Sequence, residues 1–232
     1  MSEEKNKEEK SLPSEEDKSK DIIRELGLLD TGTGFDSDIQ YINIIGSIEG
    51  HMVLPPENKT TKYEHVIPQL IAVEENPKLK GVLFILNTVG GDVEAGLALS
   101  EMISTMSKPT VSLVLGGGHS IGIPLATSTD YSFIAKTATM TLHPIRTNGL
   151  IITAETTFDY LRKTQERVID FIVRNSRAEK NRITQLMNCA DNMPNDMGTI
   201  LFGQEAVKIG IIDEVGGLSQ ALKELKERIE KK

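Results

Sequence analysis

The stretch TVSLVLGGGHSIGIPLA, residues 110–126, says most about the fold of this chain. Residues 110–115 form an apolar run, which is typical of a strand buried on both faces of a parallel sheet. A glycine-rich turn with a histidine and a serine follows it, and a short helix is predicted over 121–128. A buried strand that passes through glycines into a helix indicates an α/β fold with a mostly parallel sheet.

A second unit of the same design lies just before this one. The apolar run GVLFILN, residues 81–87, leads into the turn NTVGGD, residues 87–92, and then into a helix predicted over 93–106. The carboxyl ends of parallel strands meet at one edge of a sheet, so we expect both glycine turns on the same side of the molecule. Glycines let backbone N–H groups approach a ligand, and two such groups can form an oxyanion hole.

The remaining pattern alternates strands and helices. Strands are predicted at 39–45, 131–135, 139–143 and 210–215, and helices at about 61–75, 155–175, 178–189, 204–210 and 218–229. Residues 1–38 differ, because their first half is rich in charge and nearly devoid of large apolar side chains. We therefore predict a charged, disordered arm over 1–38 and one folded domain over 39–232.

Composition excludes several classes of function. The 232 residues carry a net charge of −8, which argues against nucleic acid and anionic lipid as main partners. The single cysteine, Cys189, rules out a disulfide framework and a cysteine-based zinc site. No apolar run reaches the length of a transmembrane helix, and the first residues do not resemble a secretion signal. We expect a cytoplasmic protein without a metal or another cofactor.

Ser120 in the second glycine turn is the candidate nucleophile, and it needs a base within hydrogen-bond reach. His119 is its neighbour, but adjacent side chains on a strand-to-helix turn diverge, so it is a poor base. His51 and His65 precede the core strands. His143 ends the strand at 139–143, one helix and one return strand after Ser120, and is the predicted base.

Other readings of the glycine turn compete with this one. A structural or phosphate-binding turn is the simplest alternative. Residues 118–122 match the G-x-S-x-G elbow of α/β-hydrolases, but the acid and histidine that should follow it are not in the required order. The G-K-[ST] of a P-loop is absent, and the spacing of a dinucleotide fingerprint is missed by one residue.

Four blocks in sequence order resemble the proteolytic subunits of the Clp protease family, within the superfamily that shares the crotonase fold. They are FILNTVGGDVEAGLALSEMI (84–103), LGGGHSIGIPLATS (115–128), MTLHP (140–144) and FGQEAVKIGIIDEV (202–215). The closer likeness is to the branch of translocation-enhancing proteins, which carries a similar charged N-terminal arm. The resemblance covers about 39–228 and implies repeated ββα units with a handle-like helix.

The resemblance also implies a function. It predicts a serine endopeptidase that cleaves peptides or unfolded proteins inside a ring-shaped homo-oligomer. Ser120 matches the family nucleophile and His143 its base, while the backbone N–H groups of Gly91 and Ile121 match the oxyanion hole. An ATP-driven unfoldase is a partner by analogy.

The third member of the triad departs from the family pattern. The aligned position is Gly198, and the nearby segment ADNMPNDMGT, residues 190–199, offers Asp191 and Asp196. We prefer Asp196, and both acids can also be read as ordinary loop residues. Two further hypotheses remain open: a non-catalytic assembly or scaffold protein, and a crotonase-type acyl-CoA enzyme, against which the pair Ser120 and His143 argues.

Overall fold

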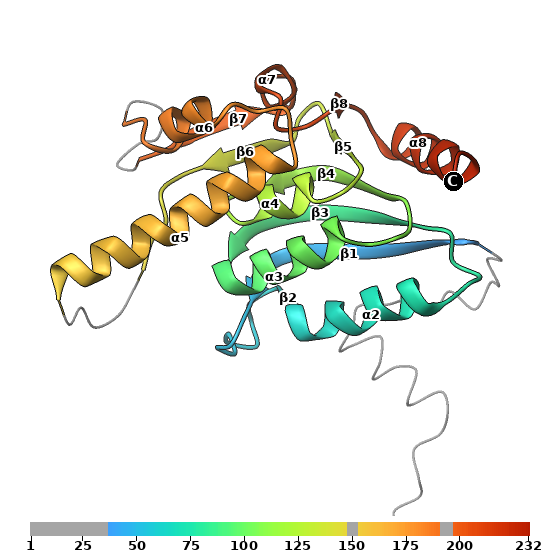
Figure 1. Ribbon diagram of the computed structural model, residues 1–232, viewed down its shortest axis with the longest axis horizontal. Coiled ribbons are helices and arrows are strands. Elements are labelled where there is room, and N and C mark those ends of the chain that lie inside the picture. Colours follow the sequence, from blue (N-terminus) through green and yellow to red (C-terminus); the bar gives the residue numbers. More distant parts are fainter. Residues whose placement is uncertain (1–36, 148–152, 191–196) are drawn as a thin grey trace, which may run out of the picture. The chain divides into compact units, whose positions relative to one another are not determined.

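The computed structural model describes residues 37–147, 153–190 and 197–232 (Figure 1). Its strands form one sheet in the order β2-β1-β3-β4-β5-β8, and β6 pairs with β4 and β7. All the pairings are parallel except that of β6 with β7. The strands are β1 (Ile39–Glu49), β2 (Thr60–Lys62), β3 (Gly81–Gly91), β4 (Thr110–Gly118), β5 (Tyr131–Ile134), β6 (Thr139–Leu142), β7 (Thr199–Phe202) and β8 (Glu214–Val215).

Helices pack on both faces of the sheet. They are α2 (Tyr63–Glu75), α3 (Val93–Ser104), α4 (Gly122–Thr127), α5 (Ala154–Arg174), α6 (Lys180–Met187), α7 (Gly203–Ile209) and α8 (Leu218–Glu230). The larger core cluster joins one face to helices α2 to α7, and a smaller cluster packs α8 against the other face. The predicted α/β fold with a mostly parallel sheet is confirmed.

Strand β3 shows why the apolar runs are continuous. Val82, Phe84 and Leu86 belong to the larger core, whereas Leu83 lies in the smaller core under α8. Successive side chains of a strand point to opposite faces, and both faces of this sheet are covered. The positions 82–86 of β3 are therefore apolar without alternation, as the sequence predicted.

The helix predicted at about 61–75 is confirmed as α2, which begins two residues later than expected. Thr60–Lys62 form the short strand β2, which pairs with the end of β1, and α2 begins only at Tyr63. Thr61 explains the difference, because its hydroxyl bonds both the N–H and the carbonyl of Ile45. Pro68 lies inside α2, which continues past it to Glu75.

Helix α5 is the handle-like element. In Figure 1 it runs beyond the edge of the sheet, with its N-terminal half farthest out. Its buried side chains begin only at Thr164, and Phe158 and Tyr160 are exposed in the outer half. The inner half alone is therefore fixed by the core.

Three parts of the predictions lie outside the described residues: the arm up to residue 36, the segment 148–152 before α5, and Asp191 and Asp196. The division into an arm over 1–38 and a domain over 39–232 stays a prediction. Of the helices that the structure describes, none is long and apolar enough to cross a membrane.

Candidate active site

Ser120 lies between the end of β4 and the start of α4 in a strained backbone conformation. Its φ is 55°, and among the described residues it is the one non-glycine residue with a positive φ. Such a conformation costs on the order of 1–3 kcal/mol and is found preferentially at functional sites. The turn is closed by N–H donation from Gly122 to the His119 carbonyl (2.8 Å) and from Ile123 to the Ser120 carbonyl (3.0 Å). Ser120 as a residue is half-buried, so part of it is exposed at the end of the strand.

The two glycine turns meet at Ser120. A Cβ atom on Gly90 would lie 2.7 Å from the Ser120 Cβ and 3.3 Å from its Oγ, so the α-carbon of Gly90 packs directly on the serine side chain. The His119 N–H also donates to the Thr88 carbonyl across the same junction (3.1 Å). The expectation that both turns share one side of the molecule is confirmed.

The residues predicted to form an oxyanion hole flank this junction. A Cβ on Gly91 would lie 2.2 Å from the Ile48 carbonyl oxygen, so only glycine fits against β1. Asp92 fixes the next position, because its N–H donates to the Ile48 carbonyl (2.9 Å) and its carboxylate accepts from the Ala95 N–H (2.8 Å) at the start of α3. The turn is therefore held by a strand on one side and a helix on the other.

Ile121 is buried against the first turn of α3. A Cβ on Gly96 would lie 2.3 Å from the Ile121 Cγ1, which shows how closely α3 and α4 approach. The backbone of Ile121 is thereby fixed directly after Ser120, on well-packed elements. An oxyanion hole requires this kind of rigidity, since its donors act without reorganising.

His143 follows the last residue of β6, and β6 is bonded to the serine turn. The Ser120 N–H donates to the carbonyl of Thr141, two residues before His143 (2.9 Å). The His143 Nδ1 lies 2.7 Å from the carbonyl oxygen of Pro144. A carbonyl only accepts, so this contact assigns the proton of a neutral His143 ring to Nδ1 and leaves Nε2 as the acceptor. This is the tautomer that a general base for a serine needs.

The position aligned with the family acid touches His143 but cannot carry a side chain in this geometry. Gly198 has a φ of 134°, and a Cβ there would lie 2.3 Å from the Leu142 carbonyl oxygen and 2.9 Å from the His143 Cβ. Its N–H donates to the Cys189 carbonyl (2.7 Å). This bond joins two described residues on either side of 191–196, and Asp191 and Asp196 themselves lie outside the described residues.

His119, dismissed as a base, has a defined place of its own. Its Nδ1 lies 2.8 Å from the Thr141 hydroxyl, and a Cβ on Gly117 would lie 2.5 Å from its Nε2. Burial first, and then the positive charge of His143, lowers the pKa of the His119 imidazole. Sequence reasoning missed Thr141, although it lies in the block MTLHP that pointed to His143.

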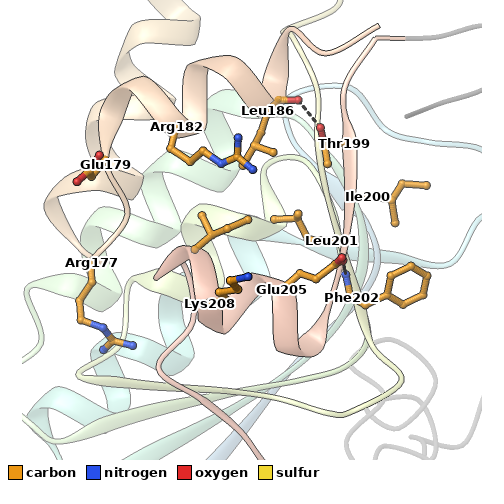
Figure 2. A pocket seen from close by; sticks show the side chains of 11 residues that line it. Arg177, Glu179, Arg182, Leu186, Thr199, Ile200, Leu201, Phe202, Glu205 and Lys208 are labelled. Carbon is orange, nitrogen blue, oxygen red and sulfur yellow. Dashed lines mark hydrogen bonds between the residues drawn. The ribbon is translucent and has the colours of Figure 1, made fainter. Parts of the chain in front are cut away.

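A hollow of about 860 Å³ lies elsewhere, between α6, β7 and α7 (Figure 2). Ile200 and Phe202 of β7 line it with charged side chains such as Arg182 and Lys208, while Ser120 and His143 do not. The hollow is therefore separate from the predicted catalytic residues. Within the ranges that the structure describes, no three metal-ligating side chains come together.

Several known proteins are similar to this chain in sequence or in fold. The family model described as Clp protease matches residues 35–218. The translocation-enhancing protein TepA of Halalkalibacterium halodurans is 55% identical over 222 residues, which cover 94% of this chain and 87% of that protein. The ATP-dependent Clp protease proteolytic subunit 1 of Chlamydia muridarum is 25% identical over 140 residues, which cover 58% of this chain and 69% of that protein.

Among solved structures, a point mutant of ClpP1 from Listeria monocytogenes superposes with a TM-score of 0.63 at 19% identity. The match covers 79% of this chain and 94% of that one, and it shows the ClpP-like fold. The family match spans both glycine turns, Ser120 and His143, and the chain belongs to the Clp protease family.

Proposed function

We propose that this protein is a serine endopeptidase with Ser120 as nucleophile and His143 as base. One observation carries the proposal: the strained serine turn packs on the Gly90–Gly91 turn and is hydrogen-bonded to β6, the strand directly before His143. This arrangement provides the components for acyl transfer, namely an accessible hydroxyl, a base and a glycine turn beside the hydroxyl.

The reaction follows from these roles. Nε2 of His143 takes the proton of the Ser120 hydroxyl as Oγ bonds to the peptide carbonyl carbon. The N–H groups of Gly91 and Ile121 bind the resulting oxyanion. The C–N bond then breaks, and His143 gives its proton to the leaving amine. Water, deprotonated by His143, then bonds to the acyl carbon, and His143 returns this proton to Oγ of Ser120 as the ester C–O bond breaks.

The imidazolium formed in this cycle needs a partner on Nδ1. The Pro144 carbonyl orients the ring but has no full charge with which to stabilise imidazolium. We assign the charged role to Asp196, which lies two residues before Gly198 in the sequence, because Gly198 packs on His143. Asp191 is the alternative from the same segment.

The assembly and the substrates belong to the same proposal. The likeness to Clp proteolytic subunits supports a homo-oligomeric ring that encloses the sites and admits peptides or unfolded proteins in the cytoplasm. The outer half of α5, with its exposed aromatic side chains, is the element we assign to contacts between rings. An ATP-driven unfoldase would supply unfolded chains to such a ring.

Labelling with a fluorophosphonate probe, followed by peptide mapping, tests the assignment. The Ser120 Oγ–P bond should form with loss of fluoride in the wild type. No labelling should occur in Ser120→Ala, while Ser107→Ala, at an exposed serine outside the site, should label like the wild type. Label on another residue, or label retained in Ser120→Ala, would refute the role of Ser120.

Gly198 at the aligned acid position favours a second candidate, a ring-forming scaffold without peptidase activity. A folded, assembled protein that resists the probe would support this candidate. The crotonase-type alternative would show instead as binding of a CoA thioester.

A further inference from the structure

Thr141 is bonded twice to the dipeptide that carries the nucleophile. Its carbonyl accepts from the Ser120 N–H (2.9 Å), and its hydroxyl lies 2.8 Å from the His119 Nδ1. Thr141 belongs to β6 and precedes His143 by two residues. A main-chain bond and a side-chain bond therefore join the turn of Ser120 to the strand that leads into His143.

The imidazole of His119 has little freedom to leave this bond. Its ring lies on Gly117, where a Cβ would come within 2.5 Å of Nε2 and 2.7 Å of Cδ2. The backbone N–H of His119 donates to the Thr88 carbonyl of β3 (3.1 Å). His119 is thus held between β3, β4 and β6, and its ring packs on Gly117 of β4 while it is bonded to Thr141 of β6.

We propose that His119 is a positioning residue that, through Thr141, holds Ser120 and His143 at their working separation. The proposal rests on the function proposed above and adds a residue to it. β6 pairs with β4 at a single position, Gly117 with Thr139, so the backbone ladder alone joins the two strands weakly. The link from His119 to Thr141 is the side-chain bond that supplements this pairing next to the reacting groups.

A neutral imidazole suits this position. Burial and the charge of His143 both oppose protonation of His119, and in the described part of the chain His143 is the titratable group whose charge acts on it. When His143 accepts the serine proton, a neutral His119 adds no repulsion. A lysine or arginine in its place would oppose that step.

Saturation kinetics of fluorophosphonate labelling test the link. Thr141→Val keeps the side-chain shape but lacks the hydroxyl. We expect it to lower the labelling rate at saturating probe about 10-fold, because one hydrogen bond is lost. The half-saturating probe concentration should not change. Thr141→Ser should recover most of the rate, and Thr129→Val, a part-buried hydroxyl bonded outside the site, should match the wild type.

A double-mutant cycle separates positioning from general destabilisation. His119→Ala should slow labelling as Thr141→Val does, and the double variant should be no slower than either single one. Wild-type rates in folded Thr141→Val and His119→Ala would overturn the proposal. Independent, additive losses would overturn it as well.

Histidine NMR titration of the Ser120→Ala protein gives a readout that needs no activity. Thr141→Val should shift the His119 Nδ1 resonance, and His143→Gln should raise the pKa of His119. A probe-resistant wild type would refute the proposed peptidase, whereas a His119 signal insensitive to both substitutions would refute the link. The two failures are therefore distinguishable.

Discussion

Replacing Gly90 with alanine perturbs the contact between the two glycine turns directly. The new Cβ would lie 2.7 Å from the Ser120 Cβ, whereas ordinary contacts begin near 3.4 Å, so the two groups must separate by about 0.7 Å. Gly90 also has a φ of 89°, where alanine costs about 1–2 kcal/mol, and the crowding adds about 1–3 kcal/mol. A displacement of about 1 Å at a reacting group can lower a rate 100-fold, so we expect labelling of Ser120 to slow by roughly 10- to 100-fold.

Gly210→Ala is the matched control. Gly210 has a φ of 90°, so alanine there bears the same backbone strain, but it ends α7 and packs on Arg177 rather than on Ser120. The two variants are compared by thermal unfolding, and labelling rates are measured where both are folded. We expect comparable destabilisation but a slower rate in Gly90→Ala alone. A folded Gly90→Ala with the wild-type rate would refute the inference that this contact positions Ser120.

Three further predictions concern charge. Asp196→Asn should lower the labelling rate at least about 100-fold, because an amide cannot stabilise imidazolium, whereas Asp191→Asn should not; equal rates would remove Asp196 from the triad. Because the pKa of His119 is lowered, the unfolded chain binds a proton near its ordinary value of 6.5 while the folded chain does not. Stability should therefore fall as pH drops from about 7.5 to about 5.5, with a smaller fall in His119→Asn; identical melting-temperature profiles would contradict this. The exposed pair of Glu94 and Arg167 should show a coupling free energy of only about 0.2–1 kcal/mol in a double-mutant cycle, weakened by salt, and a larger value would contradict its exposure.

The parts of the fold that could be predicted from the sequence are those where a local pattern of apolar residues has a single physical explanation. The apolar runs at 81–87 and 110–115 indicated strands covered on both faces, and the structure places them as neighbours in the sheet. The strand β2 could not be predicted, because it depends on pairing with β1 and on the bonds of Thr61 to Ile45, both of which join distant residues. Local pattern carries no information on such partners.

The candidate site divides in the same way. Ser120 and His143 follow from chemistry, since a hydroxyl needs a base and the chain offers few histidines. The role of His119 does not follow, because the sequence shows it beside Ser120 but not beside Thr141, its partner across 22 residues. The positive φ of Ser120 could not be predicted either, because its neighbours in space, Gly90 and Thr141, are distant in the sequence.

The glycine at the aligned acid position has a physical consequence for the whole site. An aspartate at residue 198 would place its Cβ within 2.3 Å of the Leu142 carbonyl oxygen, so β6 and β7 would have to separate at the point where His143 emerges. In the proposed site the carboxylate is therefore assigned to Asp196 or Asp191, and without either of them the Pro144 carbonyl would be the partner of Nδ1. In the second case the imidazolium lacks a charged partner, and the strict positioning of Ser120 by Gly90 and Thr141 becomes the main source of rate. Comparing the losses of labelling rate in Gly90→Ala and Asp196→Asn therefore shows how much of the rate depends on the position of Ser120 and how much on a charged partner of His143.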